Sequence, residues 1–121
     1  MTLGSAPEIT RQNGVTVIAM GPGYEQIDEL QLEGLTKVVL DAADAADPPL
    51  LVIDLSHTKF FGSGFIEILF RAWHRLNARG GRLALSNLTT YCREVIDVTH
   101  LDRLWNIYAT RAEAVKALSP E

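Results

Sequence analysis

The sequence has a single cysteine among its 121 residues and no long apolar run. One cysteine cannot form a disulfide within the chain, so we interpret Cys92 as a small buried apolar residue in a reducing compartment. The central apolar run, residues 50–53, is far shorter than the roughly 17 to 25 residues of a membrane-spanning helix. Residues 1–14 lack the basic start and apolar middle of a secretory signal. The sequence therefore predicts a cytoplasmic protein without a membrane partner.

Basic residues are also few, with 11 lysines and arginines against 15 acidic residues and a net charge of −4. Binding to nucleic acid calls for a concentrated basic face, so we expect no nucleic-acid partner. The charge is uneven, because residues 1–54 hold nine acidic and two basic residues, whereas residues 55–121 hold six acidic and nine basic. Such an asymmetry can steer a protein partner, and ordinary solvated helix faces account for it equally well.

The length and composition match one globular domain. Hydrophobic residues make up 47% and charged residues 21% of the chain, which is close to the average for folded domains. A chain of 121 residues has no room for a second core of similar size. We therefore expect a single domain over residues 1–121, with its core over about residues 9–118.

Strand and helix patterns alternate along the chain. The predicted strands span residues 15–20, 50–54, 82–85 and 104–108, and the predicted helices span residues 28–44, 64–79, 90–98 and 110–118. Capping-box pairs mark two helix starts, namely Asp28 with Gln31 and Thr110 with Glu113. This alternation favours βαβ crossovers, and hence an α/β fold with a largely parallel sheet covered by helices.

The second predicted helix carries an apolar stripe. Its members recur at helical spacing and are Phe65, Leu69, Ala72 and Leu76. We expect this stripe to pack on the sheet, with Glu67 and Arg71 as an exposed ion pair on the opposite side. Gly80-Gly81 then ends the helix.

Gly62-Ser63-Gly64 lies at the predicted passage from loop to second helix. Backbone N–H groups at a helix start lack helical partners, and the helix dipole favours negative charge there, so Ser63 is a candidate site for a phosphate. Ser63 is also a candidate N-cap of the helix, a common role for serine. Both interpretations can hold for the same residue.

No catalytic or metal-binding pattern is present in the sequence. The hydrolase nucleophile elbow requires G-x-S-x-G, whereas glycines flank Ser63 directly. His57, His74 and His100 show neither a triad order nor metal-ligand spacing. We therefore predict that the protein is not an enzyme and has no metal site and no cofactor.

From about residue 15 to residue 118 the chain resembles the STAS family, whose best-known members are bacterial anti-sigma-factor antagonists. The resemblance depends on four segments, namely LVIDLS at 51–56 followed by Phe60-Phe61, LNARGGRLAL at 76–85, REVIDVT at 93–99 and LDRL at 101–104. Their order and spacing match the family's central strand, the passage from helix to strand, and the late helix. The resemblance implies a single STAS-like domain with about four helices and a mixed, mostly parallel sheet of four to five strands.

The resemblance also implies a function in partner switching. In that family an antagonist binds a GHKL-type serine kinase that acts as an anti-sigma factor, and phosphorylation of a loop serine releases it. Ser63 matches the acceptor serine, whereas Gly62 stands in place of the loop aspartate, Gly64 in place of a hydroxyl residue and Phe65 in place of a glycine. The implied partner-binding loop consists of Phe61, Gly62, Ser63, Gly64, Phe65 and Glu67.

The leading hypothesis is thus a bacterial, cytoplasmic signalling protein of the anti-sigma-factor-antagonist type, monomeric or weakly homodimeric, with Ser63 as a candidate phosphorylation switch in transcription regulation. One alternative is an unphosphorylated STAS scaffold or oligomerisation module, which would need Ser63 only as a helix cap. The other is a small-ligand-binding domain or a degenerate enzyme, which a pocket with several converging polar groups would support.

Overall fold

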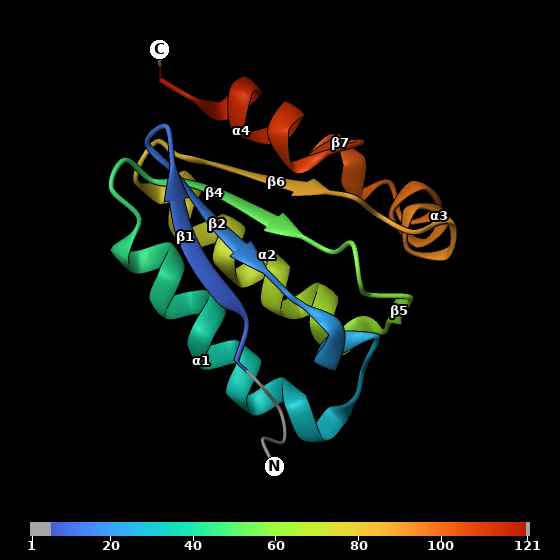
Figure 1. Ribbon diagram of the computed structural model, residues 1–121. Coiled ribbons are helices and arrows are strands. Elements are labelled where there is room, and N and C mark those ends of the chain that lie inside the picture. The colour runs from blue at the N-terminus through green and yellow to red at the C-terminus, as the bar shows by residue number, and fades with distance from the viewer. Residues whose placement is uncertain (1–5, 121) are drawn as a thin grey trace.

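Five strands form one mixed sheet in the computed structural model, which describes residues 6–120 (Figure 1). Their order across the sheet is β1 (Glu8–Gln12), β2 (Val15–Ala19), β4 (Leu50–Asp54), β6 (Arg82–Ser86) and β7 (Asn106–Tyr108). Only β1 runs antiparallel to its neighbour, and the other pairs are parallel. The predicted α/β fold with a mostly parallel sheet is confirmed.

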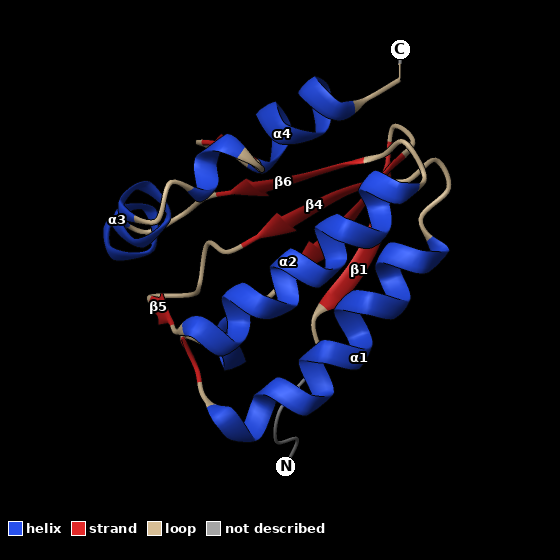
Figure 2. Cartoon of the chain, turned by 180° about the vertical axis from the view of Figure 1, so that it is seen from behind, coloured by secondary structure: helices blue, strands red, loops and turns tan. Residues whose placement is uncertain are grey.

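Four α-helices accompany these strands among the described residues, as predicted, three of them between strands and α4 after the last strand. They are α1 (Glu29–Ala45), α2 (Ser63–Ala78), α3 (Thr90–Val98) and α4 (Arg111–Leu118). Helices α1 and α2 lie side by side on one face of the sheet, and α4 lies on the other (Figure 2). The helix α3 stands beyond the end of the sheet, next to the small strand β5 (Figures 1 and 2).

The core has a large part and a small part, one on each face of the sheet. The large part lies between the sheet and helices α1 and α2, and it includes the predicted stripe of α2, with Leu69 and Leu76 at 0% exposure. Trp105, also at 0%, belongs to the same part. The small part lies under α4 and consists of Val15, Val17, Val52, Ala84, Ala114, Val115 and Leu118.

The helix ends follow the sequence signals. Asp28 caps α1 through a capping box with Gln31, and Thr110 caps α4 in the same way with Glu113. At the end of α2 the chain turns through Gly80, whose φ of +76° is accessible to glycine at little cost. A Cβ on Gly81 would lie 1.9 Å from the carbonyl oxygen of Pro49, so only glycine fits where α2 passes into β6.

The fold differs from the sequence predictions in one strand of the five-stranded sheet that was not predicted, one strand boundary and one ion pair. The strand β1 was missed because EITRQ holds one apolar residue and shows no strong alternation. The last strand begins at Asn106 rather than at residue 104, because Leu101–Arg103 form a 3-10 turn that carries Trp105 into the core. The expected ion pair between Glu67 and Arg71 is absent from the described residues, which is common for exposed pairs that contribute little energy.

Candidate functional site

The loop between β4 and α2 begins at an ion pair whose carboxylate is buried and whose guanidinium is partly exposed. Asp54, the last residue of β4, is only 4% exposed, and its Oδ1 accepts a hydrogen bond of 2.9 Å from the backbone N–H of Ser56. Its Oδ2 accepts a hydrogen bond of 2.7 Å from Nε of Arg111, the first residue of α4. A charge-assisted pair on the buried Asp54 carboxylate helps to fix the direction in which the chain leaves the sheet.

The far end of the same loop is fixed by two other elements. Strand β5 (Phe60–Phe61) pairs in parallel with β3 (Gln26–Ile27), and the N–H of Lys59 donates to the carbonyl of Glu25 at 2.8 Å. On the other side, Oγ1 of Thr89 donates to the carbonyl of Lys59 at 3.3 Å. The loop is therefore held in place before it reaches α2.

Cys92 supports the loop from within the core. It is 0% exposed, as the sequence predicted, and its thiol contacts the carbonyl of Thr58 at 3.6 Å. Burial raises the pKa of the Cys92 thiol, which disfavours the reactive thiolate. Its contacts make Cys92 a packing residue of α3.

Ser63 is the first residue of α2, and the structure corrects its expected capping role. The N-cap is Gly62, and no side chain caps this helix. The exposed Ser63 hydroxyl has no hydrogen-bond partner among residues 6–120, so it is available for modification. The first helical hydrogen bond runs from the N–H of Ile66 to the carbonyl of Gly62, which leaves the N–H groups before it open to an anion.

The two glycines beside Ser63 have different surroundings. A Cβ on Gly62 would meet nothing within 4 Å, and its φ of −112° suits any residue. A Cβ on Gly64 would lie 2.4 Å from Cδ1 of Leu32, because α1 approaches α2 closely at this point. Position 62 is therefore free, and a side chain at position 64 would require only the end of the half-buried Leu32 side chain to move.

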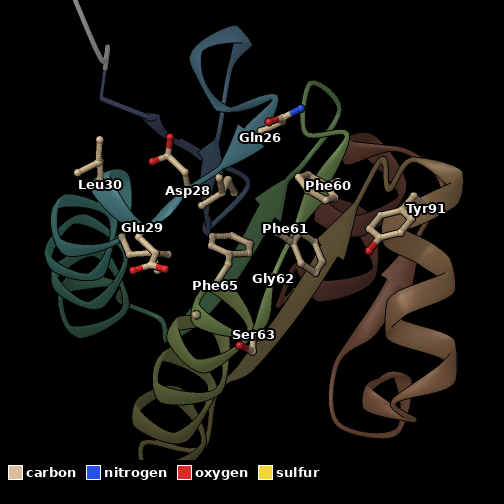
Figure 3. Close-up of a pocket in the computed structure, with 13 residues that line it drawn as sticks. Gln26, Asp28, Glu29, Leu30, Phe60, Phe61, Gly62, Ser63, Phe65 and Tyr91 are labelled. Atoms are coloured by element: carbon tan, nitrogen blue, oxygen red, sulfur yellow. The ribbon is translucent and has the colours of Figure 1, made fainter.

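A hollow of about 840 Å³ opens beside Ser63 between the starts of α1 and α2 (Figure 3). We name it the Ser63 hollow. Its lining residues are Gln26, Ile27, Asp28, Glu29, Leu30, Leu32, Phe60, Phe61, Gly62, Ser63, Gly64, Phe65 and Tyr91. It therefore includes most of the loop that the resemblance implied for partner binding.

Three large apolar side chains around this hollow face solvent. Leu30 is 93% exposed, Tyr91 47% and Phe60 45%, and the rings of Phe60 and Tyr91 lie 5.5 Å apart. Figure 3 shows Leu30 on the α1 side and the two rings on the opposite side. Exposed apolar groups gathered around one hollow are typical of a surface that contacts another protein.

The implied loop residues divide into exposed and buried ones. Phe61 and Phe65 are 3% and 1% exposed, and their rings lie 5.2 Å apart beneath the hollow. Gly62 and Ser63 lie at the surface, whereas the exposed Glu67 is not among the lining residues. The two phenylalanines thus support the loop from below, and direct contact with a partner falls to the exposed residues.

The charge of the hollow is negative. Asp28 and Glu29 line it, and no lysine or arginine is among its lining residues. Lys59 lies near its edge, but its Nζ is 4.0 Å from a carboxylate oxygen of Glu25. A phosphate on Ser63 would add charge of the same sign to this surface.

Sequence reasoning missed Leu30, Phe60 and Tyr91. Leu30 falls outside the buried stripe of α1, and Tyr91 falls outside the buried side of α3, where Cys92 and Ile96 point inward. An apolar residue off the buried stripe of an amphipathic helix was the available signal. Phe60 lies on the short strand β5 and gave no such signal, and the convergence of the three residues became visible only in the fold.

Residues 6–120 contain no cluster of three or more His, Cys, Asp or Glu side chains that could hold a metal ion. Within the same range, no helix has the length and apolar character needed to cross a membrane.

Comparison with known proteins adds to this picture. The STAS domain family model matches residues 6–114. An anti-sigma-factor antagonist (STAS) domain protein from Planctomyces limnophilus is 36% identical, with a TM-score of 0.90 over 95% of this chain and 99% of that chain. An anti-sigma factor antagonist from Mycobacterium paratuberculosis is 28% identical, with a TM-score of 0.80 over 97% of each chain. No curated protein sequence matches the chain.

A more distant likeness is to the Bacillus cell fate determinant SpoIIAA in its phosphorylated form. It is 18% identical, with a TM-score of 0.66 over 93% of this chain and 98% of that chain, and so shows the fold alone. The fold and the site together define an α/β domain built like those of anti-sigma-factor antagonists. This chain belongs to the STAS domain family.

Proposed function

We propose that this protein is an anti-sigma-factor antagonist that binds a kinase-type anti-sigma factor at the Ser63 hollow and is released when Ser63 is phosphorylated. The observation that carries this proposal is the pairing of an exposed, unpartnered Ser63 hydroxyl with three exposed apolar side chains around the same hollow. The hydroxyl suits a kinase, and the apolar side chains suit a protein surface. The protein would then act in the cytoplasm and perform no catalysis of its own.

Phosphorylation would change the charge at this surface more than its shape. A phosphate adds about −1.5 to −2 charges and three strong acceptor oxygens. The open N–H groups at the start of α2 can hold those oxygens locally. The added charge lies beside Asp28 and Glu29, so a partner drawn to the unmodified hollow would meet a more negative surface.

The likeness to SpoIIAA supports the same idea. That protein is known in unphosphorylated and phosphorylated forms, and both match the fold of this chain. The identity is 18% in each case, so the likeness supports the fold alone. The proposal of a switch in this chain therefore relies on the geometry around Ser63. The absence of an acid at position 62 has no steric cause, because the space beside Gly62 is open.

The first test is phosphate acceptance. The wild-type protein serves as bait in native extract, and the captured GHKL-type kinase is incubated with ATP and either wild type or Ser63→Ala. Intact-mass measurement should show one added phosphate on wild type and none on Ser63→Ala. Unmodified wild type after capture of such a kinase would contradict the switch and favour the scaffold or oligomerisation module.

A small-ligand site is the second candidate function. The hollow of about 840 Å³ has the size of ligand pockets, and the polar side chains of Gln26, Asp28 and Ser63 line it. A small molecule that copurifies with the protein and protects Ser63 from the kinase would favour this alternative. Native mass spectrometry of the freshly isolated protein would detect it.

A further inference from the structure

The sheet has an open edge at β1, on the side away from β7. Strand β1 pairs with β2 along all five residues and has no neighbour on its other side among residues 6–120 (Figure 1). An edge strand presents a row of unpaired backbone N–H and C=O groups, which favours pairing with another strand. Ile9, in the middle of this edge, is 48% exposed although it is a large apolar residue.

A shallow groove lies beside this edge, between β1 and α1. We name it the β1 groove, and it has a volume of about 570 Å³. Its lining includes Ile9, Thr10 and Arg11 from β1 and Val38, Asp41 and Ala42 from α1. Asp41 is already paired with Lys37 at 3.1 Å, and the Arg11 guanidinium donates to the carbonyl of Asp47. The groove thus offers apolar surface while its charged groups are engaged within the chain.

We propose that a second copy of this chain pairs with β1, so that two sheets join edge to edge around a two-fold axis at Thr10. An axis perpendicular to the sheet makes the two β1 strands antiparallel and keeps their faces aligned. Centring it on Thr10, the middle residue of β1, pairs all five residues of each strand. Centring it on any other residue leaves residues unpaired.

The sequence of β1 is complementary to itself in this register. Thr10 lies opposite Thr10 of the second copy, Ile9 opposite Arg11, and Glu8 opposite Gln12. No like charges lie directly opposite each other, and paired threonines are favourable across antiparallel strands. The two Arg11 side chains are diagonal neighbours, and each guanidinium donates to the carbonyl of Asp47 in its own chain. The two Ile9 side chains become diagonal neighbours on the face that carries α1, so each shields the exposed apolar surface of the other.

This surface is separate from the Ser63 hollow. No residue lines both the Ser63 hollow and the β1 groove. The homodimer would therefore leave both of its Ser63 hollows open and could engage two partner molecules at once. The inference does not depend on the proposed function, because pairing at β1 needs no kinase and no phosphate.

The test uses charge at the two-fold axis. Thr10→Lys and Thr10→Glu each place like charges opposite one another in the homodimer, and an equimolar mixture of the two places opposite charges there. Sedimentation velocity over a concentration series should show a dimer for wild type. Each single variant should have a dimer dissociation constant about tenfold higher, and the mixture should recover the dimer. Fluorescent labelling of one variant identifies the mixed dimer.

Asn106→Lys is the matched control, because Asn106 is exposed on β7 at the other edge of the same sheet. It should dimerise like wild type, and thermal unfolding checks that both Thr10 variants are folded. A wild type that stays monomeric at every concentration would overturn the proposal. Single variants that dimerise like wild type, or a mixture that fails to recover the dimer, would overturn it as well.

Discussion

The two faces of the sheet are covered unequally. On one face, α1 and α2 lie over the larger part of the core and contact each other along their lengths. On the other face, the eight-residue helix α4 covers a core of seven buried residues and is tied to β4 by the pair between Arg111 and Asp54. The first face depends on apolar packing, and the second depends on fewer apolar contacts and one half-buried ion pair.

The two faces also position different parts of the candidate site. The Ser63 hollow lies at the starts of α1 and α2, so it is placed by the well-packed face. The ion pair under α4 fixes the beginning of the loop that leads to Ser63. Mutations in the two faces should therefore differ in their effect on stability, and changes of exposed residues at the hollow should have the smallest effect.

The largest expected loss follows truncation in the α2 stripe. Leu69 is 0% exposed in the larger part of the core, so Leu69→Ala should lower the free energy of unfolding by about 2 to 5 kcal/mol. Val115→Ala, in the smaller part, should cost about 1.5 kcal/mol at roughly 0.8 kcal/mol per methyl removed. Urea unfolding measures both, and equal losses would remove the distinction between the faces.

A smaller loss should follow Gly81→Ala. The added Cβ would lie 1.9 Å from a backbone oxygen of Pro49, and the backbone must shift to make room, at about 1 to 3 kcal/mol. Gly34→Ala is the control, because its Cβ meets nothing within 4 Å and it lies within α1. Alanine there should stabilise the protein by up to about 1 kcal/mol. Chemical denaturation should therefore show a lower free energy of unfolding for Gly81→Ala and a higher one for Gly34→Ala. A higher free energy of unfolding for both variants would disprove the close approach of Gly81 to Pro49.

Breaking the ion pair under α4 should lower the free energy of unfolding by a moderate amount. Arg111→Met keeps an apolar stem but leaves the Asp54 carboxylate buried without its cation. The Arg111 side chain is 36% exposed, so water offsets part of the loss, and we expect about 1 to 2 kcal/mol. Lys116→Met on the exposed side of α4 should stay within about 0.5 kcal/mol of wild type. Equal melting curves for the two variants would show that the pair does not hold α4.

The smallest change in the free energy of unfolding is expected for a substitution at Gly62, beside the hollow. An aspartate there meets open space and can cap α2, so Gly62→Asp should raise stability by a few tenths of a kcal/mol, about 0.3. Thermal unfolding would detect this shift. A loss of about 1 kcal/mol or more would show that the loop requires glycine at position 62.

Local patterns predicted much of this fold. The α2 stripe, the capping boxes at Asp28 and Thr110 and the central apolar strand are each encoded within a few residues. Strand β1 was not predictable in this way, because its strand structure depends on pairing with β2 rather than on its own sequence.

The site was predicted only in part. Gly62-Ser63-Gly64 indicated a helix start, but whether Ser63 or Gly62 is the N-cap depends on backbone angles that the pattern does not set. The pair between Asp54 and Arg111 joins residues 57 positions apart, and the rim of the hollow joins α1, β5 and α3. Such contacts arise from tertiary packing, which no local window contains.

The most direct test of the account compares partner affinity when one negative charge is added at either end of α2. Ser63→Asp places it in the Ser63 hollow, and Asn77→Asp places it on an exposed residue near the far end of the same helix. Titration calorimetry against the purified kinase should show binding at least about tenfold weaker for Ser63→Asp and within about twofold of wild type for Asn77→Asp. Equal affinities for wild type, Ser63→Asp and Asn77→Asp would contradict a partner surface controlled by charge at Ser63.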